Sequence, residues 1–360
     1  MVDVVLTRSR RRVGGALAVL VLVLLALAPA AAIAAEFGPE QVVIRSRGMQ
    51  AGIRSAVAAD GVVHGFSTVT GTEPDEVRYV EGRGSRWRVE ATPYRGHVLS
   101  TAVDATGSYL LYRARDGLRV TKRLADGRYT AGHLLLAETA VPPAGSVQAD
   151  LVAAGGRWWA VWGLEGGHDL WEAGTFGGVF RSGRVAGSSA PDSSPTLALT
   201  TTGPQDAVLV WLRSGALWAA RASRPGAWRD SRQLGGPARY PELVVDGSTL
   251  HLAFFRAGRV FYGTGPWQGL RTGPVPGPLP SEPVVLAASR GRVFLVCSQF
   301  TGSEVMLITR SSPTGRWRTS ALWTNSYDWH EFAVTAHRGL GTVFVGAHKS
   351  LKVLARSQER

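Results

Sequence analysis

The chain has 360 residues, of which 45% are hydrophobic and 19% are charged, and its formal net charge at pH 7 is +13. This composition excludes a disordered or collagen-like chain, and the single cysteine excludes a small domain held together by internal disulfides. Arginine supplies nearly all of the positive charge, because the lysines are only Lys122, Lys349 and Lys352. The arginines are scattered singly after residue 12, so the charge by itself does not predict a nucleic-acid partner.

The first 35 residues have the pattern of a secretory signal peptide. Arginines within 8–12 precede an almost wholly apolar stretch over 13–27, which is followed by Pro29 and by small residues over 32–34. A basic start, an apolar centre and a small-residue exit are typical of such leaders. The apolar segment is also long enough to span a bilayer, so an uncleaved anchor is the alternative. We therefore expect a secreted or membrane-tethered extracellular protein, with residues 36–360 forming one domain.

One motif recurs through the rest of the chain: a glycine, one or two further residues, and then a bulky aromatic. The six aromatics, here called the corner aromatics, are separated by 39 to 51 residues. They are Trp87, Tyr129, Phe180, Trp228, Trp267 and Trp317. A second marker, a turn rich in Asp and Gly, precedes each of them by a similar interval. Repeats of this length that are filled with short strands indicate a radial all-β fold.

Each repeat is expected to contain four short strands. In 241–277, apolar and aromatic runs alternate with glycine-centred turns at Gly247, Gly258 and Gly265, which is typical of successive β-hairpins. The same template fits five other segments, and the first strand of each is interpreted as small, apolar and close to a central axis. The five segments are 52–92, 98–137, 147–186, 195–235 and 283–323.

The last repeat supplies only three strands, over 331–335, 342–346 and 351–354. A fourth strand is available at the other end of the domain, over 41–44. An N-terminal strand that completes the last blade would remove two exposed sheet edges at once. The sequence therefore predicts an all-β, seven-bladed β-propeller whose last blade is closed by an N-terminal strand.

With these strands and corners in place, the chain resembles the sialidase-type (BNR-like) β-propellers and the related propeller lectins. Their signature turn is Ser-x-Asp-x-Gly-x-Thr-Trp, and the segment from Ser311 through Gly315 to Trp317 is similar to it, although it lacks the Asp and is one residue shorter. The segment from Ser223 to Trp228 departs further. The resemblance covers about residues 38–356. It implies glycan binding or glycan hydrolysis outside the cell, with degenerate repeats.

Ligands of a propeller are expected over the axis, in the loops that enter the first strands or join the second and third strands. The polar and aromatic residues of these loops are therefore the candidate binding residues. They are Tyr327, Asp328, Trp329, His330, Glu331, His168, Asp169, Tyr240, Glu242 and His97. Trp329 is the best candidate for stacking on a sugar, because it lies outside the repeat. The corner aromatics are interpreted mainly as structural, since they recur in every blade.

The alternative is catalytic. A sialidase-like site needs three arginines that hold a carboxylate, a Tyr–Glu nucleophile pair and an acid. The chain offers the pairs Tyr240–Glu242 and Tyr327–Glu331, with Arg54 and Arg239 for the clamp. Simple glycosidase chemistry needs only two carboxylates, such as Asp169 and Glu331.

The sequence leaves three functions open. The leading hypothesis is a secreted, non-catalytic binding module for an extracellular or cell-surface glycan or another envelope polymer, present as a monomer. A divergent sialidase-like hydrolase or lyase is the first alternative, and an envelope scaffold with a protein partner is the second. No catalytic residue, cofactor or nucleic-acid partner is predicted. No metal is predicted either, because histidine spacings typical of a metal site are missing from residues 36–360.

Overall fold

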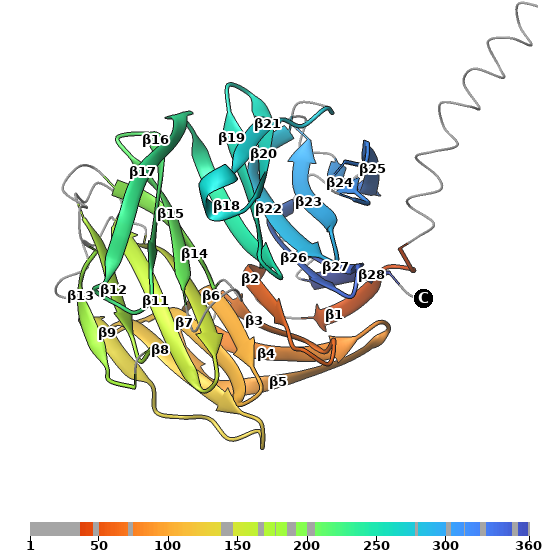
Figure 1. Ribbon diagram of the computed structural model, residues 1–360. Coiled ribbons are helices and arrows are strands. Elements are labelled where there is room, and N and C mark those ends of the chain that lie inside the picture. Colours follow the sequence, from red (N-terminus) through yellow and green to blue (C-terminus); the bar gives the residue numbers. More distant parts are fainter. Residues whose placement is uncertain are drawn as a thin grey trace, which may run out of the picture.

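Seven four-stranded antiparallel sheets stand around a central axis, as Figure 1 shows. The first strand of each sheet lies innermost and contacts the first strands of the neighbouring sheets. The seven-bladed propeller predicted from the repeats is thus confirmed. The computed structural model describes residues 37–45, 50–70, 75–137, 147–164, 169–176, 178–185, 192–199, 206–277, 280–299, 304–312, 314–324, 329–347 and 352–358.

The blades follow the chain in order, each from its inner to its outer strand. Blade 1 contains β2 (Gln50–Val57), β3 (Val63–Val69), β4 (Glu76–Arg83) and β5 (Arg86–Arg95). Blade 2 contains β6 (His97–Asp104), β7 (Gly107–Ala114), β8 (Gly117–Leu124) and β9 (His133–Ala137). Blade 3 contains β10 (Val147–Ala154), β11 (Arg157–Leu164), β12 (Leu170–Gly174) and β13 (Arg181–Arg184).

The next three blades repeat this plan. Blade 4 contains β14 (Asp192–Leu199), β15 (Ala207–Arg213), β16 (Ala216–Ala222) and β17 (Trp228–Pro237). Blade 5 contains β18 (Arg239–Asp246), β19 (Thr249–Arg256), β20 (Arg259–Gly265), the short 3-10 helix Trp267–Gly269 and β21 (Arg271–Pro274). Blade 6 contains β22 (Pro280–Ser289), β23 (Arg292–Gln299), β24 (Glu304–Arg310) and β25 (Trp317–Thr324).

Blade 7 is shared between the two ends of the folded domain. It contains β26 (Trp329–His337), β27 (Leu340–Ala347), β28 (Lys352–Ser357) and, outermost, β1 (Gln41–Arg45). The outer pair is antiparallel, with Gln41 opposite Ala355, and red β1 lies beside blue β28 in Figure 1. The predicted closure by an N-terminal strand is therefore correct.

The hydrophobic core is divided among the spaces between neighbouring blades. One cluster, for example, packs Trp159 and Val161 of blade 3 against Leu209 and Trp211 of blade 4. Along the rim of the inner turns, side chains of one blade bond backbone amides of the next. The Asp246 carboxylate accepts a 2.6 Å hydrogen bond from the amide of Gly291 in this way. Each blade is thus held by its neighbours rather than by a core of its own.

Most corner aromatics pack onto the preceding blade, so their structural interpretation is confirmed there. The Trp87 ring meets Phe344 of blade 7 with centroids 5.1 Å apart, and the Trp317 ring meets Tyr262 of blade 5 at 5.0 Å. The Trp228 indole of blade 4 lies 5.1 Å from that of Trp159. Phe180 differs, because 47% of its surface remains exposed.

Two further observations concern burial and membranes. Cys297 is buried and free, and burial raises the pKa of its thiol to about 12. None of the helices in the described ranges has the length and apolar character that crossing a bilayer requires.

Candidate functional site

The inner strands are less apolar than the sequence interpretation held. Six of the seven place at least one polar side chain in the lining of the axis, among them Arg54, Ser100, Asp150, Thr196, Glu242 and Glu331. Several of these residues follow a break in strand register, such as the breaks between Val98 and Ser100 and between Arg239 and Glu242. A β-bulge re-aims the side chains next to it. The bulges therefore explain how a small apolar strand turns a charged residue inward.

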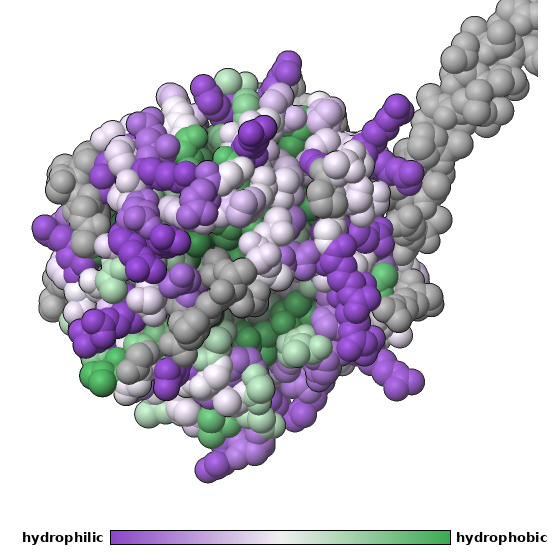
Figure 2. Space-filling model, viewed as in Figure 1, coloured by the Kyte–Doolittle hydropathy of each residue, from purple (hydrophilic) through white to green (hydrophobic). Residues whose placement is uncertain are grey.

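These side chains line two adjoining cavities on the axis, which together we call the axial channel. One cavity has a volume of about 420 Å³ and extends toward the ends of the inner strands, past Val57 and Ala336. The other, of about 380 Å³, lies at their beginnings and is lined by His97 and Tyr240. Figure 2 shows this face hollowed near its centre, with hydrophobic surface at depth between more hydrophilic groups.

Arg54 and Glu331 form an ion pair in the channel wall. The Nη1 atom of Arg54 lies 3.2 Å from Oε2 of Glu331, and the same nitrogen donates a hydrogen bond to the carbonyl of Ile53. The Nε–H group donates to the carbonyl of Leu99 on the neighbouring blade. Two backbone anchors fix the guanidinium, so a positive charge is held at a defined place on the axis.

Asp150 is anchored by four hydrogen bonds. Its carboxylate accepts from the amides of Leu197 and Leu151 and from the hydroxyls of Ser100 and Thr196, at 2.7 to 3.3 Å. Burial raises the pKa of Asp150, whereas these hydrogen bonds favour the charged form. The residue joins blades 2, 3 and 4 around the channel, so its role is first of all structural.

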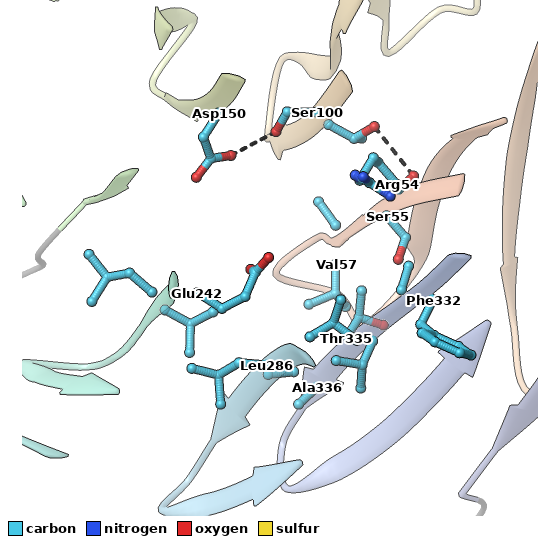
Figure 3. Close-up of a pocket in the computed structure, with 18 of the residues that line it drawn as sticks. Arg54, Ser55, Val57, Ser100, Asp150, Glu242, Leu286, Phe332, Thr335 and Ala336 are labelled. Atoms are coloured by element: carbon cyan, nitrogen blue, oxygen red, sulfur yellow. Dashed lines mark hydrogen bonds between the residues drawn. The ribbon is translucent and has the colours of Figure 1, made fainter. Parts of the chain in front are cut away.

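Glu242 is held differently. Its half-buried carboxyl faces the cavity, opposite Asp150 and Arg54 in Figure 3. Within the described part of the chain it accepts no hydrogen bond. Burial raises the pKa of Glu242 to about 8, the negative charge of Asp150 adds to the effect, and Arg54 opposes it. At neutral pH this carboxyl is therefore mostly protonated and can both donate and accept a hydrogen bond.

The structure brings together four of the predicted binding residues. Glu242 and Glu331 line the larger cavity, and His97, Tyr240 and Glu242 line the smaller one. Burial lowers the pKa of His97, although nearby Glu331 opposes this. Tyr240 is 40% exposed and has a φ of 48°, a left-handed conformation within the bulge of β18.

The other predicted residues are not gathered there. Asp169 pairs with Arg184, 2.5 Å away, and does not line the channel with Glu331. Tyr327, Asp328 and His168 lie outside the described residues, as do the side chains of Trp329 and His330. Arg239 lines a separate cavity on the outside of blade 5, so among the described channel residues Arg54 is the one arginine. These residues do not assemble a three-arginine clamp.

The sequence interpretation missed Ser100 and Asp150. The signal was present, because Asp150 is a carboxylate in the middle of the otherwise apolar run Ala149 to Ala154. A charged residue inside an inner strand is costly unless it is bonded or faces a water-filled channel. No cluster of three or more His, Cys, Asp and Glu side chains suited to a metal occurs in the described ranges.

Comparison with known proteins identifies the fold but not a family. No protein-family model matches the chain, and no curated protein matches it. Among solved structures, the fucose-specific lectin from Aleuria aurantia is similar with a TM-score of 0.52 and 13% identity, over 79% of this chain and 99% of the lectin. The NanB sialidase from Streptococcus pneumoniae has a TM-score of 0.52 at 10% identity, over 89% of this chain and 71% of the sialidase.

A third similar structure has a different activity. Kuenenia stuttgartiensis hydrazine synthase has a TM-score of 0.56 at 10% identity, over 87% of this chain and 96% of that one. Identities this low show a shared β-propeller architecture, which supports many unrelated functions. The argument about function therefore depends on the axial channel.

Proposed function

We propose that this protein is an extracellular β-propeller that binds a glycan in its axial channel without altering it. The observation that carries the proposal is the carboxyl of Glu242, which faces the cavity and has no hydrogen-bond partner among the described residues. A carboxyl that lines a cavity and has no protein partner can bond a ligand without breaking a hydrogen bond within the protein. The basic and apolar leader at 1–35 supports the extracellular location.

The lining of the channel suits a sugar. Sugar hydroxyls both donate and accept hydrogen bonds, and the channel offers the guanidinium of Arg54, the carboxylate of Glu331 and the protonated carboxyl of Glu242. The apolar Val57 and Leu286 cover the opposite part of the cavity, where the C–H face of a pyranose can pack. A few polar groups within an apolar wall are typical of small-molecule sites. The similar folds include a fucose-specific lectin and a sialidase.

A binding array of neutral and acidic glycans tests the proposal on residues 36–360. We expect binding to a defined glycan that persists at about 0.5 M NaCl, where contacts between exposed charges are screened. Glu242→Leu should weaken this binding about tenfold or more, because leucine has neither a hydrogen-bond donor nor an acceptor. The control is Asp116→Leu, which changes an exposed acid in the β7–β8 turn. Equal binding by the Glu242→Leu and wild-type proteins, or no binding, would overturn the proposal.

A glycoside hydrolase is the second candidate, and one observation favours it. Glu242 is largely protonated at neutral pH while Glu331 of the same cavity is paired with Arg54, and two carboxyl groups in unlike environments are the usual acid and base of such enzymes. A screen of aryl glycosides separates the candidates. Turnover that disappears in Glu242→Gln while sugar binding persists would favour the enzyme; binding without turnover would favour the binding module.

A further inference from the structure

The space between blades 2 and 3 departs from the repeat. In the other described corners, the aromatic packs on the blade before it, as Trp228 does on Trp159. Phe180 of blade 3 also meets the blade before it, but only at the outer edge, where its ring stacks on His133 of β9 at 6.1 Å with an interplanar angle of 17° and the residue remains 47% exposed. Its other ring contact among the described residues is with Trp158 of its own blade, at 6.2 Å.

A cavity of about 640 Å³ lies between the two blades, which are neighbours in Figure 1. Tyr109, Thr121 and Lys122 line it from blade 2, and Arg157 and Trp158 from blade 3. We call it the inter-blade pocket. It is larger than either cavity of the axial channel, and its size is within the range of small-molecule sites.

The inter-blade pocket is basic, unlike the axial channel. Lys122, Arg157 and His133 line it, and no acidic side chain is among its described lining residues. The Lys122 ammonium lies 4.6 Å from the centroid of the Tyr109 ring and contacts the hydroxyl of Thr106. The nearest turn carboxylate, Asp104, is occupied by the amide of Gly156 and the hydroxyl of Thr106. Neither Lys122 nor Arg157 has a carboxylate partner among the described residues.

We propose that the inter-blade pocket is a second saccharide site, specific for a sugar unit that carries a carboxylate. Lys122 and Arg157, one from each wall, bind the anion, and the exposed Phe180–His133 pair covers one face of the ring. The Thr121 hydroxyl is already bonded to Tyr94 and Thr130, so the half-buried Thr130 hydroxyl and the backbone of Gly132 bond the remaining sugar oxygens. The choice of a saccharide rests on the proposed function, whereas the location and the preference for an anion do not.

The test is titration calorimetry of residues 36–360 with cellobiouronic acid and with its uncharged counterpart cellobiose. We expect the acidic disaccharide to bind at least tenfold more tightly than cellobiose. The double variant Lys122→Gln/Arg157→Gln should remove this preference. The matched control Arg316→Gln/Arg318→Gln removes the same charge from exposed positions on blade 6 and should retain it. Phe180→Ala should weaken both disaccharides by a similar factor.

The two proposals fail in different ways. Loss of uronate binding in Glu242→Leu, with no change in Lys122→Gln/Arg157→Gln, would overturn the inter-blade site and leave the axial site in place. Equal losses of uronate binding in Lys122→Gln/Arg157→Gln and in Arg316→Gln/Arg318→Gln would mean that overall positive charge explains the preference. That result would also overturn the inter-blade site. Uronate binding that depends on Lys122 and Arg157 but not on Glu242 would support the inter-blade site, even if the array finds no axial ligand.

Discussion

Desolvation raises the pKa of both Glu172 and Glu242, yet the two carboxyl groups have opposite surroundings. Glu172 is 1% exposed and accepts hydrogen bonds from the indoles of Trp159 and Trp228 and from the amide of Gly226, at 2.8 to 3.0 Å. Glu242 faces a cavity without such donors among the described residues. We infer that Glu172, which is surrounded by hydrogen-bond donors, stabilises a blade junction, whereas Glu242, which lacks such donors, is available to a ligand.

The largest effect is expected at Glu172. Its replacement by alanine leaves two indole N–H groups and one amide without their acceptor, and burial keeps water from replacing it. We expect a loss of about 3 kcal/mol in the free energy of unfolding. Urea denaturation followed by tryptophan fluorescence measures it. A loss below about 1 kcal/mol would mean that Glu172 is no more structural than Glu242.

Glu242→Gln should increase the free energy of unfolding, whereas replacement of Glu172 by alanine should decrease it. The folded-state pKa of Glu242 is about 8, whereas an unfolded glutamate titrates near about 4.3. The folded state therefore binds the extra proton between these values, and stability falls as pH rises from about 4 to about 8. Glutamine does not titrate, so the variant should be more stable than wild type by on the order of 2 kcal/mol at pH 9, a figure discounted for water in the channel.

Melting curves of wild type and Glu242→Gln at pH 4 and pH 9 measure this difference. The curves should nearly coincide at pH 4, where both side chains are neutral. A gap of the same size at both pH values would show that Glu242 does not carry the raised pKa. A gain of stability in Glu242→Gln at pH 9, together with loss of ligand binding in Glu242→Leu, is the pattern expected of a functional residue.

Trp228→Phe should destabilise the junction of blades 3 and 4 around Glu172, but less than replacement of Glu172 by alanine does. Phenylalanine retains a ring against Trp159 but cannot donate to Glu172, which keeps its other two donors. We expect a loss of about 1–2 kcal/mol, measured by urea denaturation. An unchanged stability would mean that the Trp228 corner contributes through its ring alone.

Phe180→Ala should have the smallest effect on stability. The side chain is 47% exposed and does not fill the junction before it, so the expected change is within about 0.5 kcal/mol. Urea denaturation measures this change in the free energy of unfolding, with Trp228→Phe as the reference variant. A loss as large as that of Trp228→Phe would show that Phe180 is an ordinary corner aromatic and would weaken the case for the inter-blade pocket.

The repeat made the architecture predictable. Glycine turns and corner aromatics at a regular spacing indicated seven blades, and the one strand missing from the last repeat, which has only three strands after residue 331, indicated closure by residues 41–44. The axis was less accessible to sequence reasoning, because a bulge decides whether a residue such as Glu242 faces the channel or a neighbouring blade. Bulges depend on local register rather than on residue type, so loops were favoured over strand residues such as Glu242. Asp150 was overlooked for another reason: β10 pairs without a break in register, and the apolar neighbours of Asp150 led to a structural interpretation of that strand.

The inter-blade pocket was beyond prediction for a different reason. Phe180 satisfies the corner motif as well as Trp228 does, and only the packed structure shows that its ring lies elsewhere. A motif identifies the position of a side chain along the chain, whereas the neighbouring blade decides which rotamer is occupied.

The pairing of β1 with β28 has a consequence for how the protein folds. Residue 41 must find residue 355, so the last sheet cannot be completed until nearly the whole chain is available. The six other blades form from local hairpins and can assemble early. Ring closure is thus expected to be the slow step, during which the edge of β28 is open to other chains and to aggregation.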